Sequence, residues 1–130
     1  MKTNLYSCEN LIRKIDSVKL VTKPAEYLCG QSVIAMLADV SVDEVQNDRG
    51  TTAAEIKFAL EWYGLVTESK SRVTYADGAS LPECTVLSIK MPGYGHWLLY
   101  FRGKFYDPEF GVSDDLPERA KRCYYWEIAK

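Results

Sequence analysis

A cysteine opens an apolar helical pattern in residues 28–38, which read LCGQSVIAMLA. Val33 and Leu37 lie four positions apart, the spacing of residues on one buried helix face, so we expect a helix over residues 30–39. Cys29 then stands in the first turn of that helix, where the positive end of the helix dipole favours the thiolate over the thiol. The stretch therefore predicts a core helix that carries a nucleophile at its start.

Further helices are expected in the first half of the chain. Apolar residues recur at helical spacing over residues 4–16. A capping-box pattern at Ser41 opens a short helix to about residue 47, and another at Thr52 opens a helix over residues 53–63 that ends at a glycine. The first half is thus predicted to be mainly helical.

The second half changes to strand patterns. Strands are expected over residues 85–91, 96–101 and 123–128, with 104–106 as a hairpin partner of 96–101, and with one or two solvent-facing strands within 65–75. The nearly continuous apolar run of 96–101 is typical of a central strand covered on both faces. N-terminal helices followed by an antiparallel sheet predict a single α+β domain over residues 1–130.

Charge and cysteine usage narrow the function classes. The formal net charge of -2 gives no reason to expect nucleic acid or a membrane as a partner. Four cysteines without a C-x-x-C pair and one histidine offer too few ligands for zinc, so we expect no metal and no cofactor. Two disulfides are conceivable, but residues 1–20 show no signal peptide and no run reaches transmembrane length, which favours free thiols in the cytoplasm. The oligomeric state stays open.

Two residues could complete a site with Cys29. His96, the only histidine, opens the central strand, and Asp107 follows the hairpin partner of that strand. If the hairpin turns on Arg102-Gly103, both residues lie on one sheet face as diagonal neighbours, about 7–8 Å apart at the backbone and within reach of a hydrogen bond. A turn centred on Gly103 alone would place Asp107 on the opposite face. In the first register the three residues supply a nucleophile, a base and an orienting carboxylate.

Each of these residues also has a purely structural explanation. Free cysteines are commonly buried as small apolar side chains, and this explanation suffices for Cys8, Cys84 and Cys123. A histidine at a strand end is often a hydrogen-bonded structural residue, and aspartate before proline is typical of a turn. The case for a site therefore rests on the three residues occurring together.

The order of these motifs resembles that of papain-like cysteine peptidases, and especially the bacteriocin-processing (double-glycine) peptidase domains of peptide exporters and their stand-alone relatives. The shared pattern is Cys-Gly at a helix start, Gly-His before an apolar strand, and Tyr-Asp-Pro with a nearby glycine, over about residues 23–111. The resemblance implies a papain-like fold with Cys29 as thiolate nucleophile, His96 as general base and acid, and Asp107 orienting the ring. It also implies hydrolysis of a peptide or isopeptide bond through an acyl-enzyme at Cys29.

One position departs from that family. The family usually has a glutamine six residues before the cysteine, whose amide donates to the oxyanion, and this chain has Lys23 there. The ammonium of Lys23 could replace that donor. Two alternatives stay open beside a peptidase: a catalytically impaired module that binds a peptide or protein partner in the same cleft, and a thiol acyltransferase that uses an amine in place of water. The substrate is open as well, because a Gly-Gly preference rests on fold-level analogy.

Overall fold

The computed structural model describes residues 17–23, 28–45, 52–65, 73–75, 80–121 and 123–128. Within these residues the helices come first: α1 (Cys29–Ala38), α2 (Val42–Val45) and α3 (Ala53–Trp62). The strands follow: β1 (Val73–Thr74), β2 (Cys84–Met91), β3 (Tyr94–Phe101), β4 (Lys104–Asp107), β5 (Gly111–Ser113) and β6 (Cys123–Glu127). The expected α+β order is confirmed. The helix expected over residues 4–16 lies outside the described residues, as does most of the segment 65–75.

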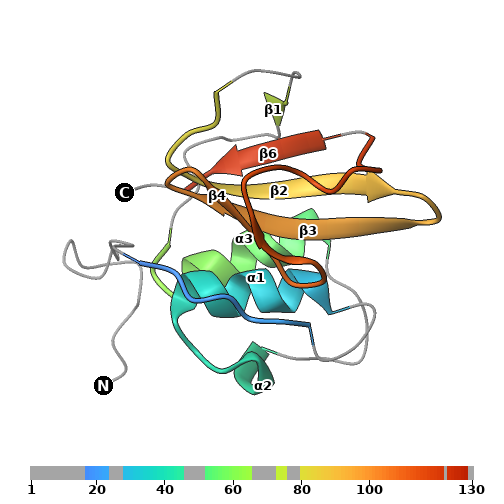
Figure 1. Cartoon of the computed structure of the whole chain (residues 1–130). Helices are drawn as coiled ribbons and strands as arrows, with labels where there is room; N and C mark the ends of the chain where they lie inside the picture. Colours follow the sequence, from blue (N-terminus) through green and yellow to red (C-terminus); the bar gives the residue numbers. More distant parts are fainter. Residues whose placement is uncertain are drawn as a thin grey trace, which may run out of the picture.

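The strands form one antiparallel sheet in the order β1-β6-β2-β3-β4-β5. The helices pack against one face of this sheet (Figure 1). Two core clusters lie on its two sides: Leu99 and Phe101 of β3 pack with α1 and α3, whereas Leu98 packs with Leu87 and Phe105 in the second cluster. Because β3 pairs with β2 and β4 and is buried on both faces, it is the central strand that its apolar sequence predicts.

The β3–β4 hairpin turns on Arg102 and Gly103. Their φ angles are 46° and 89°, so both central residues are left-handed, as in a type I′ turn. The ladder pairs Phe101 with Lys104 and Leu99 with Tyr106. This is the register that places residues 96 and 107 on the same face of the sheet.

The two predicted capping boxes have different outcomes. Thr52 forms a full box with Glu55: each side chain accepts from the other residue's backbone N–H. At Ser41 the hydroxyl accepts from the Asp43 N–H at 3.2 Å, but the Glu44 carboxylate accepts from the Tyr63 hydroxyl at 2.6 Å. The capping box predicted at Ser41 is therefore wrong in one of its two bonds: the Glu44 carboxylate does not cap the Ser41 N–H, because it connects α2 to the end of α3.

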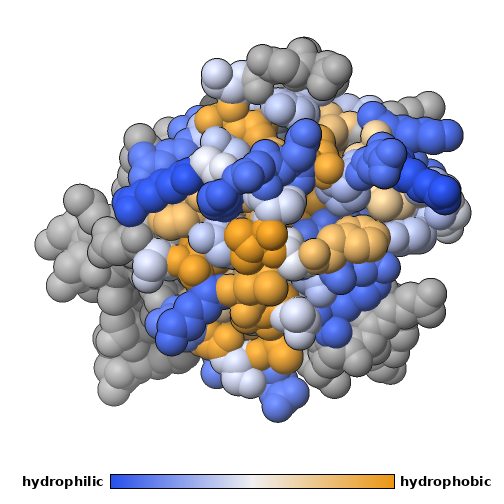
Figure 2. Space-filling view, in the orientation of Figure 1, coloured by the Kyte–Doolittle hydropathy of each residue, from blue (hydrophilic) through white to orange (hydrophobic). Residues whose placement is uncertain are grey.

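An extended segment, residues 17–23, runs beside the helices. Its Val18, Leu20 and Val21 pack against the core cluster of α1 and α3. Figure 2 shows apolar side chains gathered on the lower half of the visible face, where Figure 1 places α1, α2 and this segment. The segment ends at Lys23, whose backbone N–H donates to the Pro108 carbonyl at 3.0 Å. That bond joins it to the turn after β4.

In the described part of the chain, none of the helices has both the length and the apolar character needed to cross a membrane.

Candidate active site

Cys29 is the first residue of α1 and carries a free thiol that is 6% exposed. The carbonyl of Leu28 at the helix N-cap accepts from both the backbone N–H and the hydroxyl of Ser32, each at 3.1 Å. The first turn contains no acidic side chain. The N–H groups of the first turn, including that of Cys29, lack intrahelical partners by helix geometry, so the sulfur lies beside potential donors to an anion.

The start of β3 lies directly against this thiol. The β3–β4 ladder ends at the pair Leu99 and Tyr106, so the preceding residues of β3 are not paired with β4. There the backbone N–H of Trp97 donates to Cys29 Sγ at 3.3 Å. The N-terminus of α1 thus meets the sheet at the part of β3 that β4 does not pair with.

His96 and Asp107 form a buried pair next to this contact. His96 is 1% exposed and Asp107 2% exposed, and His96 Nε2 lies 2.6 Å from Asp107 Oδ1. The same carboxylate oxygen accepts from the backbone N–H groups of Glu109 at 2.8 Å and Phe110 at 3.1 Å. These bonds fix the carboxylate in the turn after β4, so that it orients the imidazole ring.

Two aromatic rings enclose the imidazole. Tyr94 and Phe110 approach His96 edge-on, with ring centroids 6.1 and 6.0 Å away. Because Asp107 binds Nε2, the other nitrogen, Nδ1, remains for chemistry at the sulfur. The ring can therefore move a proton at one nitrogen while its orientation is held at the other.

Opposing effects determine the pKa of His96. Burial lowers it, but the hydrogen bond with Asp107 and the interactions with Cys29 raise it, and the net effect raises the pKa from 6.5 to about 9. By contrast, burial raises the pKa of the Cys84 and Cys123 thiols to about 12. The ring is thus an imidazolium at neutral pH, and those two thiols stay protonated and inert.

Lys23 reaches the site through Glu109. Its Nζ lies 3.5 Å from Glu109 Oε2, and Glu109 Oε1 lies 3.9 Å from His96 Nδ1. The Tyr94 hydroxyl donates to Glu109 Oε1 at 2.8 Å, and the pKa of Tyr94 is raised to about 12, first by burial and then by this carboxylate. Glu109 therefore links the Lys23 ammonium and the Tyr94 hydroxyl to the Nδ1 edge of the imidazole.

The structure thus brings Cys29, His96 and Asp107 together, with Lys23 at the edge of the group. The sequence did not point to Glu109, Tyr94 or Phe110, although continuing the pairing of Phe101 with Lys104 along a two-residue hairpin puts residue 109 opposite His96. A glutamine close to Cys29 in sequence, Gln31, lies elsewhere: it lines a separate cavity with side chains of α3.

The chain has the α+β architecture of papain-like proteins, with a helix-borne cysteine against an antiparallel sheet. No protein-family model matches the sequence, and no curated protein matches it either. Among solved structures, it is similar to a double glycine motif protease from an AMS/PCAT transporter in complex with the leader peptide. The TM-score is 0.57 and the identity 18%, over 85% of this chain and 92% of that one. This likeness confirms the predicted papain-like fold.

Proposed function

We propose that this chain, residues 1–130 acting as one domain, is a cysteine peptidase that cleaves a peptide or isopeptide bond. The observation that carries the proposal is the contact of a helix N-terminal thiol with the start of β3, next to a buried His96–Asp107 pair joined at 2.6 Å. The thiol supplies a nucleophile, the imidazole a base and the carboxylate a group that orients the imidazole. The peptidase fold of the solved neighbour, which holds a leader peptide, supports a peptide substrate.

The reaction begins with attack of the Cys29 thiolate on the substrate carbonyl carbon. The His96 imidazolium gives its Nδ1 proton to the leaving amine as the C–N bond breaks, which leaves a thioester at Cys29. Neutral His96 then takes a proton from a water molecule that attacks the thioester carbon. The acid product departs and the thiolate–imidazolium pair is restored. Asp107 keeps the ring oriented through both steps.

Lys23 is proposed as an oxyanion donor together with the backbone N–H of Cys29. A donor that acts mainly in the transition state affects kcat more than KM, so Lys23→Met should lower kcat by about 10²–10³-fold with little change in KM. Steady-state kinetics on the same peptide substrate measures this split. Lys19→Met, which removes an exposed lysine of the same segment, is the matched control. An unchanged kcat in Lys23→Met would remove Lys23 from the mechanism.

Alkylation of Cys29 tests the proposal without a known substrate. At pH 6, iodoacetamide should modify Cys29 at least about tenfold faster than Cys84 or Cys123, because burial raises the pKa of those two thiols to about 12, whereas Cys29 lies beside the proposed base His96. His96→Ala should remove this advantage. Peptide mapping by mass spectrometry assigns the modified residue. If Cys29 reacts as slowly as Cys123, the chain is better explained as a peptide-binding module without turnover.

Hydrolysis and acyl transfer differ in the molecule that attacks the thioester, which is water in the first and an amine in the second. The product formed when both are present therefore distinguishes the two reactions. We propose water as the usual acceptor, so an activated peptide ester incubated with glycinamide should give mainly the free acid. A predominance of the amide product would instead identify a thiol acyltransferase. The free thiol that either reaction needs supports a reducing, cytoplasmic location.

A further inference from the structure

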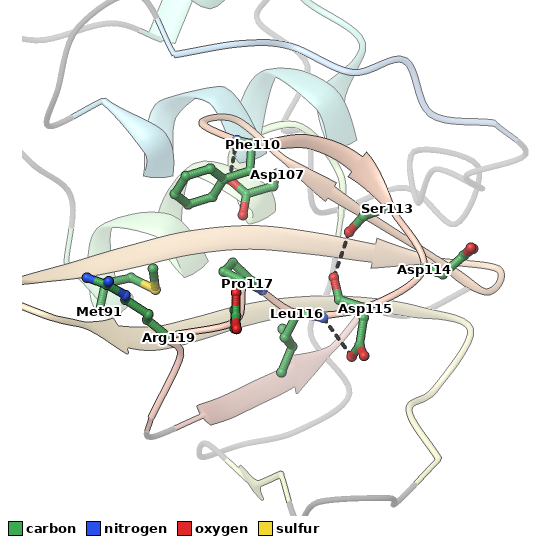
Figure 3. A pocket seen from close by; sticks show the side chains of 10 residues that line it. Met91, Asp107, Phe110, Ser113, Asp114, Asp115, Leu116, Pro117 and Arg119 are labelled. Carbon is green, nitrogen blue, oxygen red and sulfur yellow. Dashed lines mark hydrogen bonds between the residues drawn. The ribbon is translucent and has the colours of Figure 1, made fainter.

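A cavity of about 500 Å³ opens beside Asp107 (Figure 3). Apolar side chains form part of its lining, among them Met91, Leu116 and Pro117. Carboxylates form another part, among them Asp115 and Glu118. The cavity thus combines apolar surface with an excess of negative charge.

One carboxylate oxygen of Asp107 is directed at this space. Oδ1 receives the donors of His96, Glu109 and Phe110, but Oδ2 is buried and has no hydrogen-bond partner among the residues that the structure describes. Figure 3 shows this carboxylate facing the cavity. A buried charged oxygen without a donor is costly, so a ligand group that donates to it would bind favourably.

The other charged groups of the lining leave the cavity acidic. Asp114 is paired with the ammonium of Lys104, and Asp115 Oδ1 accepts from the backbone N–H of Leu116. Glu118 is exposed, and Arg119 is a cation of the lining. With Arg119, the His96 imidazolium beside Asp107 and the Lys104–Asp114 pair all counted, the three carboxylates Asp107, Asp115 and Glu118 still leave one excess negative charge. A cationic ligand therefore fits better than an anionic one.

Phe110 connects the cavity to the reaction site. Its ring lies 6.0 Å from that of His96, and the same residue lines the cavity. In the proposed reaction the leaving amine receives its proton from His96. A substrate segment that follows the scissile bond and passes Phe110 would reach the cavity.

We propose that this cavity binds a lysine side chain of the substrate on the leaving-group side of the scissile bond. The four-carbon stem packs against Met91, Leu116 and Pro117. The ammonium donates to Asp107 Oδ2 and faces the carboxylates of Asp115 and Glu118. The position of this subsite relative to the scissile bond rests on the proposed peptidase function. The affinity of the cavity for a lysine side chain does not.

Binding is tested on the Cys29→Ala variant, in which no reaction can occur. The probes are the Nα-acetyl methylamides of lysine, norleucine and glutamate, added to the full chain and followed by NMR. The lysine probe should bind at least about tenfold more tightly than the other two, because only it forms a charge-assisted hydrogen bond. It should also shift the methyl resonances of Met91 and Leu116.

Variants of these carboxylates give the matched comparison. Replacing both carboxylates at the edge of the cavity, by Asp115→Asn and Glu118→Gln, should weaken lysine binding several-fold, whereas Glu61→Gln at an exposed position of α3 should leave it unchanged. Equal affinity for the lysine and norleucine probes, or shifts that miss Met91 and Leu116, would overturn the proposal.

Cleavage by the wild-type chain tests where the lysine lies in the substrate. Peptides that carry lysine just after the scissile bond should have at least about tenfold higher kcat/KM than norleucine peptides. Lysine-probe binding without any cleavage would disprove the peptidase and keep the cavity site. Cleavage without a lysine preference would disprove only the subsite.

Discussion

Cys29→Ala is expected to lower peptide hydrolysis by about 10⁴-fold or more, to the residual rate that substrate binding and the oxyanion donors supply without a nucleophile. The variant removes the sulfur that accepts from the Trp97 N–H and the atom on which the proposed thioester forms. Alanine at the first position of α1 keeps the helix, so the fold should remain. Turnover of whichever peptide of a fluorogenic panel the wild type cleaves, with circular dichroism of both proteins, measures the effect.

The control for this variant is Cys123→Ala. Cys123 is buried in the second core cluster, and burial raises its pKa to about 12, so it should contribute no thiolate at neutral pH. A folded Cys123→Ala protein should therefore retain wild-type turnover. Retained activity in Cys29→Ala, or lost activity in a folded Cys123→Ala, would contradict the assignment of the nucleophile.

Asp107→Ala is expected to lower turnover by about 10⁴-fold and also to destabilise the fold. Its Oδ1 accepts from His96 and from the backbone N–H groups of Glu109 and Phe110, so the variant leaves three buried or part-buried donors without this acceptor. Leaving such donors unsatisfied should reduce the free energy of unfolding by about 2 kcal/mol or more. Denaturant unfolding and steady-state kinetics measure the two effects separately.

The same variant should change the pH dependence in a defined direction. The folded-state pKa of His96 is raised from 6.5 to about 9, so its contribution to stability is complete below pH 6.5 and is lost as the pH rises to about 9. Without Asp107, burial still lowers the pKa of His96, but the hydrogen bond and the charge of Asp107 no longer raise it, so this pKa falls. The stability difference between wild type and variant should thus be largest below pH 6.5 and shrink toward pH 9.

NMR reads this titration directly, because the chain has one histidine. The imidazole signals should show a midpoint near pH 9 in the wild type and a lower midpoint in Asp107→Ala. Asp107→Asn is the graded control, since it keeps an oxygen acceptor for the backbone donors and removes the charge; its midpoint should lie between the two. Equal midpoints in all three proteins would contradict the electrostatic role of Asp107.

Local patterns were enough to predict much of the fold. The spacing of Val33 and Leu37 determines α1, and the continuous apolar run of β3 identifies the central strand. The register of the β3–β4 hairpin was left open by the sequence, and the structure has the Arg102-Gly103 turn, which places His96 and Asp107 on one face. By contrast, β5 is three residues long with partly exposed side chains, too short for an alternating pattern to be visible.

The missed parts of the site depend on tertiary contacts. Glu109 could be placed opposite His96, but its links to Lys23 and Tyr94 require segments that are distant in sequence to meet. The cavity beside Asp107 combines the end of β2, the turn after β4 and residues 113–119. No spacing rule within one segment predicts such a combination. The Glu44 side chain, which binds Tyr63 rather than its own helix start, was missed for the same reason.

The two-residue turn at Arg102-Gly103 restricts how this hairpin can evolve. Successive residues of a strand point to opposite faces, so a single inserted or deleted residue in the turn would carry the carboxylate of position 107 to the far side of the sheet while leaving the hairpin intact. Length changes that preserve function should therefore come in pairs of residues. In relatives that diverged beyond recognisable sequence similarity, this loop should keep an even number of residues even where its amino acids have changed.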